Sequence, residues 1–256
     1  MRALTRRAVV GGGGAAGVMK AFGADGPPRF TTKAMRQNAS VRDVDMLLVL
    51  ATDVSNSVIK ERWEVQRSGY AAAFANEDVQ KALLSGARGA IGLCLVQWSS
   101  YDQQEHVVPW TYLDSREMIG VFSLLLKGME RQFSSNTGIG AALRYCANYL
   151  DEAPYRAERA VIDISGDGHD NQPIVIGDRV VPLPQIRDSI VARGIIINGM
   201  PILGVAEPLP RYKSLLEYYA AEVIGGSGSF VEPVENPDDI ASFAGALRRK
   251  LVAEVA

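Results

Sequence analysis

The sequence predicts an α/β protein of three layers, with helices on both faces of a doubly wound, mostly parallel sheet. Two observations predict this class. Short continuous apolar runs, such as residues 46–51 and 160–165, are typical of strands buried on both faces of a parallel sheet. Segments with apolar residues at helical spacing, such as residues 57–76, follow these runs along the chain. Alternation of this kind indicates βαβ units, whose ligands bind beyond the carboxyl ends of the strands.

Strands and helices are expected to alternate from Val44 onward. Each expected strand is an apolar run, and each expected helix has its apolar residues on one face. The strands are expected at residues 46–51, 90–98, 107–110 as a short edge strand, 160–165, 195–202 and 229–233. The helices are expected at residues 57–76, 118–126, 137–150, 184–193, 212–223 and 237–255.

Composition places the chain among ordinary soluble globular proteins. Of its 256 residues, 47% are hydrophobic and 22% charged, which is enough apolar material for one large core. The formal net charge is -2, and Lys and Arg are scattered along the sequence. No strong field therefore attracts nucleic acid or an anionic membrane, and we expect no nucleic-acid partner.

The first 24 residues have the features of an export signal. Arg6 and Arg7 precede an apolar stretch, residues 8–19, that is rich in Gly and Ala. This stretch is too short and too weakly hydrophobic to span a bilayer, and the arginine pair resembles a twin-arginine signal. Lys20 fits this interpretation poorly, and a disordered cytoplasmic tail is the alternative. We expect a periplasmic or extracellular protein without a transmembrane segment in its mature chain.

The rest of the chain is expected to form a linker and one domain. Residues 25–42 contain Pro27 and Pro28 among mixed polar residues, which is typical of a linker. Residues 43–256 then form the domain. Its two cysteines, Cys94 and Cys146, lie in apolar stretches and are expected to be small core residues, although a disulfide between them stays open.

Five oxygen-bearing residues are candidates for a metal site. Asp53, Ser55 and Ser57 follow the first apolar strand, Thr137 introduces a later helix, and Asp167 follows the strand at residues 160–165. Because the carboxyl ends of parallel strands share one edge, these residues are expected to converge on an all-oxygen pocket. Hard oxygen ligands select Mg²⁺, Mn²⁺ or Ca²⁺ over softer metals.

Each part of this pattern has a plainer interpretation. Ser57 and Thr137 are also typical helix N-caps, and an Asp-Gly pair at residues 167–168 is a common turn. Asp163 lies inside a strand and is expected to be a hydrogen-bonded structural carboxylate. His169 and Asp170 are candidates for the rim of the site, with a solvated loop as the alternative.

These residues resemble the metal-ion-dependent adhesion site of von Willebrand factor A domains. The resemblance rests on Asp-x-Ser-x-Ser, a later Thr at a helix start and a strand-terminal Asp-Gly, in that order. The resemblance extends from about Asp43 to the C-terminus and is carried by segments 44–57, 66–74, 137–143, 161–168, 196–201 and 218–230. Over this range the chain resembles an uncharacterised bacterial family of exported proteins with von Willebrand factor A-like domains. Asn56 stands where Gly is common, and residues 169–171 replace a Pro-Asn-Asn-like run. The resemblance implies that Ser55, Ser57 and Thr137 touch the cation, and that Asp53 and Asp167 act largely through waters.

The pattern favours binding over catalysis. Two carboxylates roughly neutralise a divalent cation, so the metal stays electrophilic and accepts a carboxylate from a protein partner. A phosphatase with Asp53 as nucleophile is the first alternative, but Ser55 stands where such enzymes need a second carboxylate. No Gly-x-Ser-x-Gly motif indicates a serine hydrolase. The second alternative is a structural envelope protein with a vestigial metal site.

Overall fold

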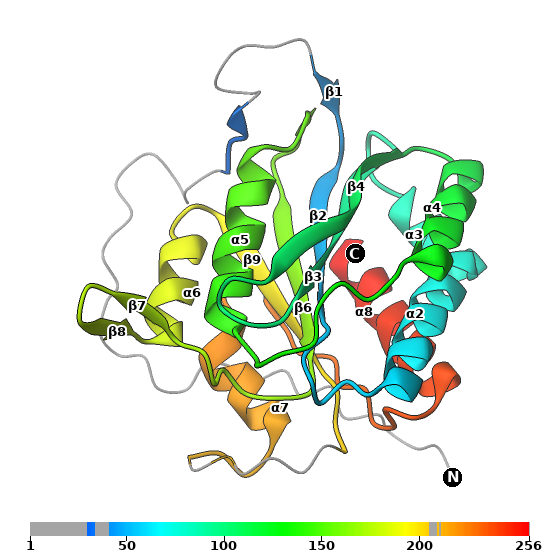
Figure 1. Cartoon of the computed structure of the whole chain (residues 1–256). Coiled ribbons are helices and arrows are strands. Elements are labelled where there is room, and N and C mark those ends of the chain that lie inside the picture. Colours follow the sequence, from blue (N-terminus) through cyan, green and yellow to red (C-terminus); the bar gives the residue numbers. More distant parts are fainter. Residues whose placement is uncertain (1–29, 34–40, 205–208, 210, 256) are drawn as a thin grey trace, which may run out of the picture.

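The computed structural model describes residues 30–33, 41–204, 209 and 211–255 (Figure 1). Within them, five strands form the main sheet in the order β4-β3-β2-β6-β9. Its strands are β2 (Met46–Asp53), β3 (Ile91–Trp98), β4 (Gln104–Leu113), β6 (Ala160–Gly166) and β9 (Ile195–Pro201). All neighbours pair in parallel except β3 and β4. The predicted doubly wound, mostly parallel sheet is therefore confirmed.

Helices cover both faces of this sheet (Figure 1). One face packs against α5 (Ile139–Asp151), α6 (Leu183–Val191), α7 (Leu215–Tyr218) and the π-helix η1 (Tyr219–Val223). The other packs against α2 (Lys60–Ala75), α3 (Glu77–Leu83), α4 (Arg116–Gly128) and α8 (Ile240–Val255). Successive side chains of β2 alternate between the two cores, because a strand points its side chains to opposite faces in turn. Leu47 and Val49 belong to the α5 side, whereas Leu48 and Leu50 belong to the α2 side.

Several short elements were not expected from the sequence. Asn76 lies at the end of α2, as expected, but it also caps an additional helix, α3, through hydrogen bonds that its side chain accepts from the backbone of Asp78 and Val79. Strands β7 (Ile174–Ile176) and β8 (Arg179–Val181) form an antiparallel hairpin. Strands β1 (Arg42–Asp43) and β5 (Tyr155–Arg156) pair in parallel.

The strand expected at residues 229–233 is the clearest difference from the sequence prediction. This segment runs beside β9 but makes only isolated bridges, Gly199 with Val231 and Ile202 with Val234. The N–H groups of Glu232 and Val234, on either side of Pro233, donate to the carbonyls of Gly199 and Pro201, whereas Pro201 itself has no N–H to donate back to the segment. Before the segment, Gly226 and Gly228 take positive φ angles of 98° and 76°. A continuous ladder is therefore interrupted although the segment lies where a sixth strand would be.

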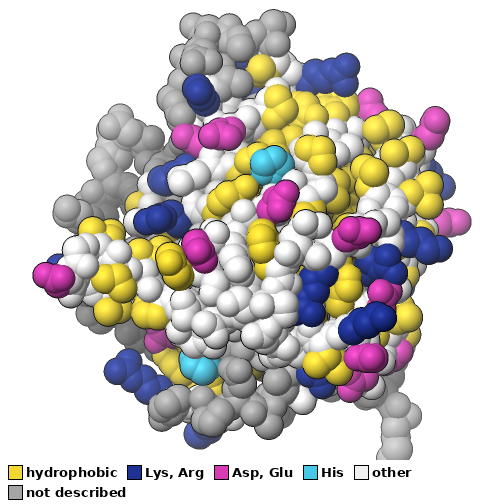
Figure 2. Space-filling model, in the orientation of Figure 1, with side chains coloured by type: hydrophobic (Ala, Val, Ile, Leu, Met, Phe, Trp, Pro, Cys, Tyr) yellow, Lys and Arg dark blue, Asp and Glu magenta, His cyan; other side chains and the backbone are white. Residues whose placement is uncertain are grey.

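The remaining expectations outside the sheet have mixed outcomes. The expected export signal, residues 1–24, lies outside the described residues, as does most of the expected linker; Phe30, from that linker, is buried in the α5-side core. Cys94 and Cys146 are buried and free. No helix in the described part of the chain is long and apolar enough to cross a membrane. On the face in Figure 2, acidic and basic side chains are interspersed.

The connectivity places a ligand site at one point of the sheet edge. From the central strand β2 the chain proceeds outward through β3 to β4, and it then returns to the other side of β2 for β6 and β9. The strand order thus reverses between β2 and β6. In doubly wound sheets ligands bind in the crevice beyond the carboxyl ends of the strands at this point.

Candidate metal centre

The carboxyl ends of β2 and β6 bring three of the predicted ligands into direct contact. Ser57, in the loop after β2, donates a hydrogen bond to Asp167 Oδ1 with an oxygen–oxygen distance of 2.5 Å. Ser55 Oγ lies 3.1 Å from Ser57 Oγ. Asp53 is the last residue of β2, and its Oδ1 accepts from the backbone N–H of Ser55 at 2.7 Å. Residues 110 positions apart in the sequence therefore share one cluster of oxygens.

The two hydroxyls that resembled helix caps are not used as caps. Helix α2 begins at Lys60, with Ile59 at its N-cap position, so Ser57 lies outside the helix. Helix α5 begins at Ile139, and Gly138 rather than Thr137 occupies its N-cap position. In neither helix does a backbone N–H donate a hydrogen bond to the side chain at the N-cap position. The plainer interpretation of Ser57 and Thr137 is therefore wrong.

Thr137 is held against the loop that follows Asp167. Its backbone N–H donates to Asn171 Oδ1 at 2.9 Å, and its carbonyl accepts from the backbone N–H groups of Asn171 and Gln172. The Thr137 side chain is buried. Asn171 therefore joins the start of α5 to the loop carrying Asp167, and it was not recognised from the sequence as a functional residue.

The two expected rim residues lie in the same loop. Asp170 Oδ1 accepts from the backbone N–H of Ile139 at 3.0 Å, so this carboxylate caps α5 from another part of the chain. Burial raises the pKa of Asp170 to about 6. Its backbone N–H donates to the Tyr218 hydroxyl, and the His169 ring meets the Tyr218 ring edge-on. The loop is thus anchored to α5 and α7, which contradicts the solvated-loop alternative for Asp170.

Close backbone packing also joins the start of α5, beside Thr137, to the end of β3. The N–H of Gly138 donates to the carbonyl of Ser99 at the end of β3. A Cβ at Gly138 would lie 3.0–3.1 Å from the backbone of residues 99–101, so only glycine lets the two segments approach this closely without a shift. The start of α5 is therefore pinned to the carboxyl end of β3.

Arg131 is a further residue of the site that sequence reasoning missed. Its guanidinium donates to the carbonyl of Val54 at 2.8 Å and to that of Ser55 at 2.6 Å. These carbonyls belong to the loop that carries the predicted ligands. Every residue has a backbone carbonyl, so a contact of this kind leaves no pattern in the sequence. Burial lowers the pKa of Arg131, while the nearby carboxylates of Asp53 and Asp167 oppose that shift.

The electrostatics of the cluster fit a bound cation. Asp53 is fully buried, and burial together with the charge of Asp167 raises the pKa of Asp53 to about 8. Among the described residues, none donates a hydrogen bond to Asp53 Oδ2. Buried oxygens without donors are typical of atoms that serve an ion or an ordered water. Octahedral Mg²⁺ places adjacent ligand oxygens about 2.9 Å apart, close to the separations found here.

The proposed ligands include few charged groups for a metal site. The described residues contain no group of three or more His, Cys, Asp and Glu side chains placed to hold a metal ion. Around Ser55 and Ser57, two carboxylates are joined by neutral hydroxyls. These residues suit a hard divalent cation that keeps part of its charge uncompensated.

Comparisons with known proteins agree with the fold. The model of the family described as "Protein of unknown function (DUF1194)" matches residues 43–256, and no curated protein matches the sequence. Among solved structures, proximal thread matrix protein 1 from the mussel byssus is 13% identical with a TM-score of 0.56, covering 84% of this chain and 49% of that one. A von Willebrand factor type A protein from Catenulispora acidiphila is 17% identical with a TM-score of 0.54, covering 81% and 42%. The pilus adhesin SpaC from Lactobacillus rhamnosus GG is 12% identical with a TM-score of 0.54, covering 88% and 31%.

These similarities concern the fold. The chain spans less than half the length of each of these three proteins. At such low identity they establish the von Willebrand factor A fold, which confirms the resemblance found in the sequence. One structure of the mussel protein has a zinc-occupied MIDAS motif, a property of that protein.

Proposed function

Because the chain belongs to the DUF1194 family across residues 43–256 and has the von Willebrand factor A fold, we propose that it is a metal-dependent protein-binding module. One divalent cation, Mg²⁺ or alternatively Mn²⁺ or Ca²⁺, binds at the carboxyl edge of the sheet. Its ligands, directly or through waters, are Asp53, Ser55, Ser57, Thr137 and Asp167. His169 and Asp170 line the rim that a partner meets.

One observation supports this proposal above the others. The Ser57 hydroxyl lies 2.5 Å from Asp167 Oδ1 and 3.1 Å from Ser55 Oγ, instead of capping α2. Three hydroxyl and carboxylate oxygens from distant segments thus occupy positions close to those of adjacent metal ligands. The fold does not require these buried oxygens to lie together for its stability. They lie where the strand order reverses, which is where doubly wound sheets bind their ligands.

The charges suggest what the cation recognises. Two carboxylates balance its charge only roughly, so it still attracts an anionic oxygen at a coordination position that the chain does not fill. The N-terminus of α5 begins beside Thr137 and favours negative charge at the same place. The partner therefore presents a carboxylate. We place the protein in the periplasm or outside the cell, which fits the expected export signal, and similar folds occur in a byssus matrix protein and a pilus adhesin.

The proposal assigns no catalytic role to the site. Asp53 as a nucleophile would require an acid or base two residues later, and that position holds Ser55. A phosphatase assay on the purified chain with Mg²⁺ is expected to give no turnover above that of Asp53→Ala.

Water-proton relaxation tests the open coordination position. The full chain loaded with Mn²⁺ is titrated with a short peptide that contains one Glu and is amidated at its C-terminus, and with the same amidated peptide containing Gln. The Glu peptide is expected to lower the relaxivity of the bound Mn²⁺, because its carboxylate replaces a metal-bound water. The Gln peptide is expected to have no effect. Equal effects of the two peptides, or no Mn²⁺ binding by calorimetry, would contradict the proposal.

Arg131 is expected to stabilise the loop after β2, which carries Ser55 and Ser57, in the conformation that binds the metal. Arg131→Ala removes the guanidinium donor to the carbonyls of Val54 and Ser55 and leaves Ser55 with only the N–H of Val58, so the loop loses part of its fixed geometry. Groups that orient metal ligands typically contribute about 10–100-fold to affinity, and we expect Mn²⁺ binding to weaken by about tenfold. The control is Arg248→Ala on α8, which removes an exposed ion pair with Asp78. Unchanged Mn²⁺ affinity in Arg131→Ala would mean that the loop is held without it.

A further inference from the structure

Tyr219 reaches the candidate metal centre from a part of the chain that contains none of the proposed ligands. It is fully buried and is the first residue of the π-helix η1. Single π-helical turns are rare and often occur at functional sites, because they shift side chains out of ordinary helical register. In this chain the turn follows directly on the helix α7, whose Tyr218 accepts from Asp170 on the rim.

Two glycines make room for the Tyr219 side chain. A Cβ at Gly199 of β9 would lie 2.8 Å from Tyr219 Cδ1, so the ring occupies space that any other residue there would fill. A Cβ at Gly166, the last residue of β6, would lie 2.7 Å from the Tyr219 hydroxyl and 2.9 Å from Asp53 Oδ2. The hydroxyl and the carboxylate oxygen therefore flank the same point above Gly166.

Both of these oxygens are buried, and neither has a hydrogen-bond partner among the described residues. The Trp98 ring lies at the same point, with Cζ2 3.2 Å from the Gly166 Cβ position, and its N–H is likewise unpartnered within the described part of the chain. Buried polar groups in proteins are nearly always paired with protein or ordered water. Packing in the space beside Gly199 needs only the ring, so the hydroxyl calls for a separate explanation.

We propose that Tyr219 is a positioning residue for the metal centre, whose hydroxyl supports the Oδ2 side of the Asp53 carboxylate through one water shared with the Trp98 N–H. Asp53 Oδ1 is already oriented by the N–H of Ser55. A donor on Oδ2 fixes the plane of the carboxylate and leaves Oδ1 and its waters directed toward the cation. This inference rests on the proposed cation site.

The test compares Mn²⁺ binding by the full chain and by Tyr219→Phe, which keeps the ring and removes the hydroxyl. We expect the Mn²⁺ dissociation constant to rise by about tenfold, as for other groups that orient metal ligands. The electron paramagnetic resonance spectrum of bound Mn²⁺ is expected to change, because the ligand geometry is less fixed. The melting temperature of the metal-free protein is expected to stay the same or rise, since a buried unpartnered hydroxyl has been removed.

Tyr70→Phe is the matched control, because Tyr70 is also buried but lies on the α2 side of the sheet. Its hydroxyl accepts from Thr52 at 2.7 Å and lies 3.2 Å from Ser165 Oγ. We expect this variant to lower the metal-free melting temperature and to leave Mn²⁺ affinity within twofold. If Tyr219→Phe instead behaves like Tyr70→Phe, the positioning role is wrong. If the wild-type chain binds no Mn²⁺, the proposed function fails first.

Discussion

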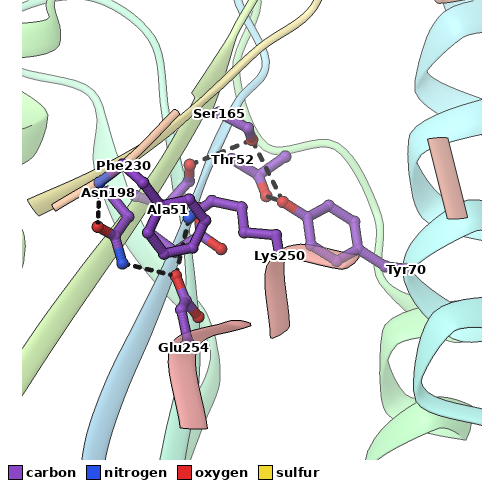
Figure 3. Close-up of polar contacts among 9 residues, drawn as sticks. Ala51, Thr52, Tyr70, Ser165, Asn198, Phe230, Lys250 and Glu254 are labelled. Carbon is purple, nitrogen blue, oxygen red and sulfur yellow. Dashed lines mark hydrogen bonds and ion pairs between the residues drawn. The ribbon is translucent and has the colours of Figure 1, made fainter. Parts of the chain in front are cut away.

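Replacing Lys250 with methionine is expected to lower the free energy of unfolding by about 3–5 kcal/mol. Lys250 on α8 is fully buried, and its ammonium lies 2.8 Å from Glu254 Oε1 (Figure 3). The same ammonium lies 3.0 Å from Asp163 Oδ1 of β6. Glu254 also accepts from the Asn198 side chain of β9 at 3.0 Å. Methionine fills the space but leaves two buried carboxyl groups without their cation, and an uncompensated buried charge is strongly destabilising.

Urea unfolding followed by circular dichroism measures this effect. The control is Lys81→Met, which removes an exposed pair with Glu77 at 3.8 Å and is expected to cost less than about 0.5 kcal/mol. Similar losses in both variants would mean that the buried cluster contributes no more than a surface ion pair. The result would also show how much this cluster contributes to the packing of α8 against the sheet, because its side chains join α8 to β6 and β9.

The same cluster predicts how stability changes with pH. Burial raises the pKa of Asp163 to about 7, Lys250 opposes that shift, and Glu254 adds to it. Tyr70 also faces Asp163 from α2, and its own raised pKa keeps it neutral. Because the folded state holds the proton more tightly than the unfolded chain, the contribution of Asp163 is full below pH 4 and is lost as pH rises through about 7. The deficit of Lys250→Met should therefore be larger at pH 8 than at pH 5, and an equal deficit at both would contradict this assignment.

The sequence specified the sheet well because its signals are local. Strands β2 and β6 are single apolar runs bounded by polar turns, and both lie within one or two residues of their expected ends. The expected strand at residues 229–233 is interrupted by its neighbour, because Pro201 of β9 has no N–H to complete the ladder with this segment. The strand ends also placed Asp53 and Asp167 correctly at one edge, since parallel strands share their carboxyl ends.

Neither the supporting residues of the site nor the buried Lys250 could be found this way. Arg131 contacts backbone carbonyls, and Tyr219 occupies space left by Gly166 and Gly199 on two other strands. Lys250 follows Arg248 and Arg249 in an amphipathic helix and looks like another surface cation. In each case at least one partner lies far away in sequence, on an element whose position the local pattern does not reveal. Such contacts become visible only when the packing of the layers is known.

The second large effect concerns Asp53, and its sign depends on the cation. In the metal-free protein Asp53 is buried close to Asp167, and both burial and that charge disfavour its ionised form. Asp53→Asn keeps the shape and removes the charge, so we expect the metal-free variant to be as stable as the wild type or more stable. A carboxylate retained only for structure would give the opposite result, because replacing it would remove stabilising bonds.

Adding the cation should reverse the order of stability. A ligand that binds only the folded state at 100 times its dissociation constant stabilises it by about 2.7 kcal/mol, which is a rise of about 5–10 °C in melting temperature for a domain of this size. We expect Mg²⁺ or Mn²⁺ to raise the melting temperature of the wild type by this amount and to leave Asp53→Asn unchanged. Asp178→Asn in the exposed turn between β7 and β8 is the control, and it should respond to the cation like the wild type. If Asp53→Asn also gains stability on adding the cation, the metal is bound elsewhere, because this site would have lost one of the two carboxylates among its proposed ligands.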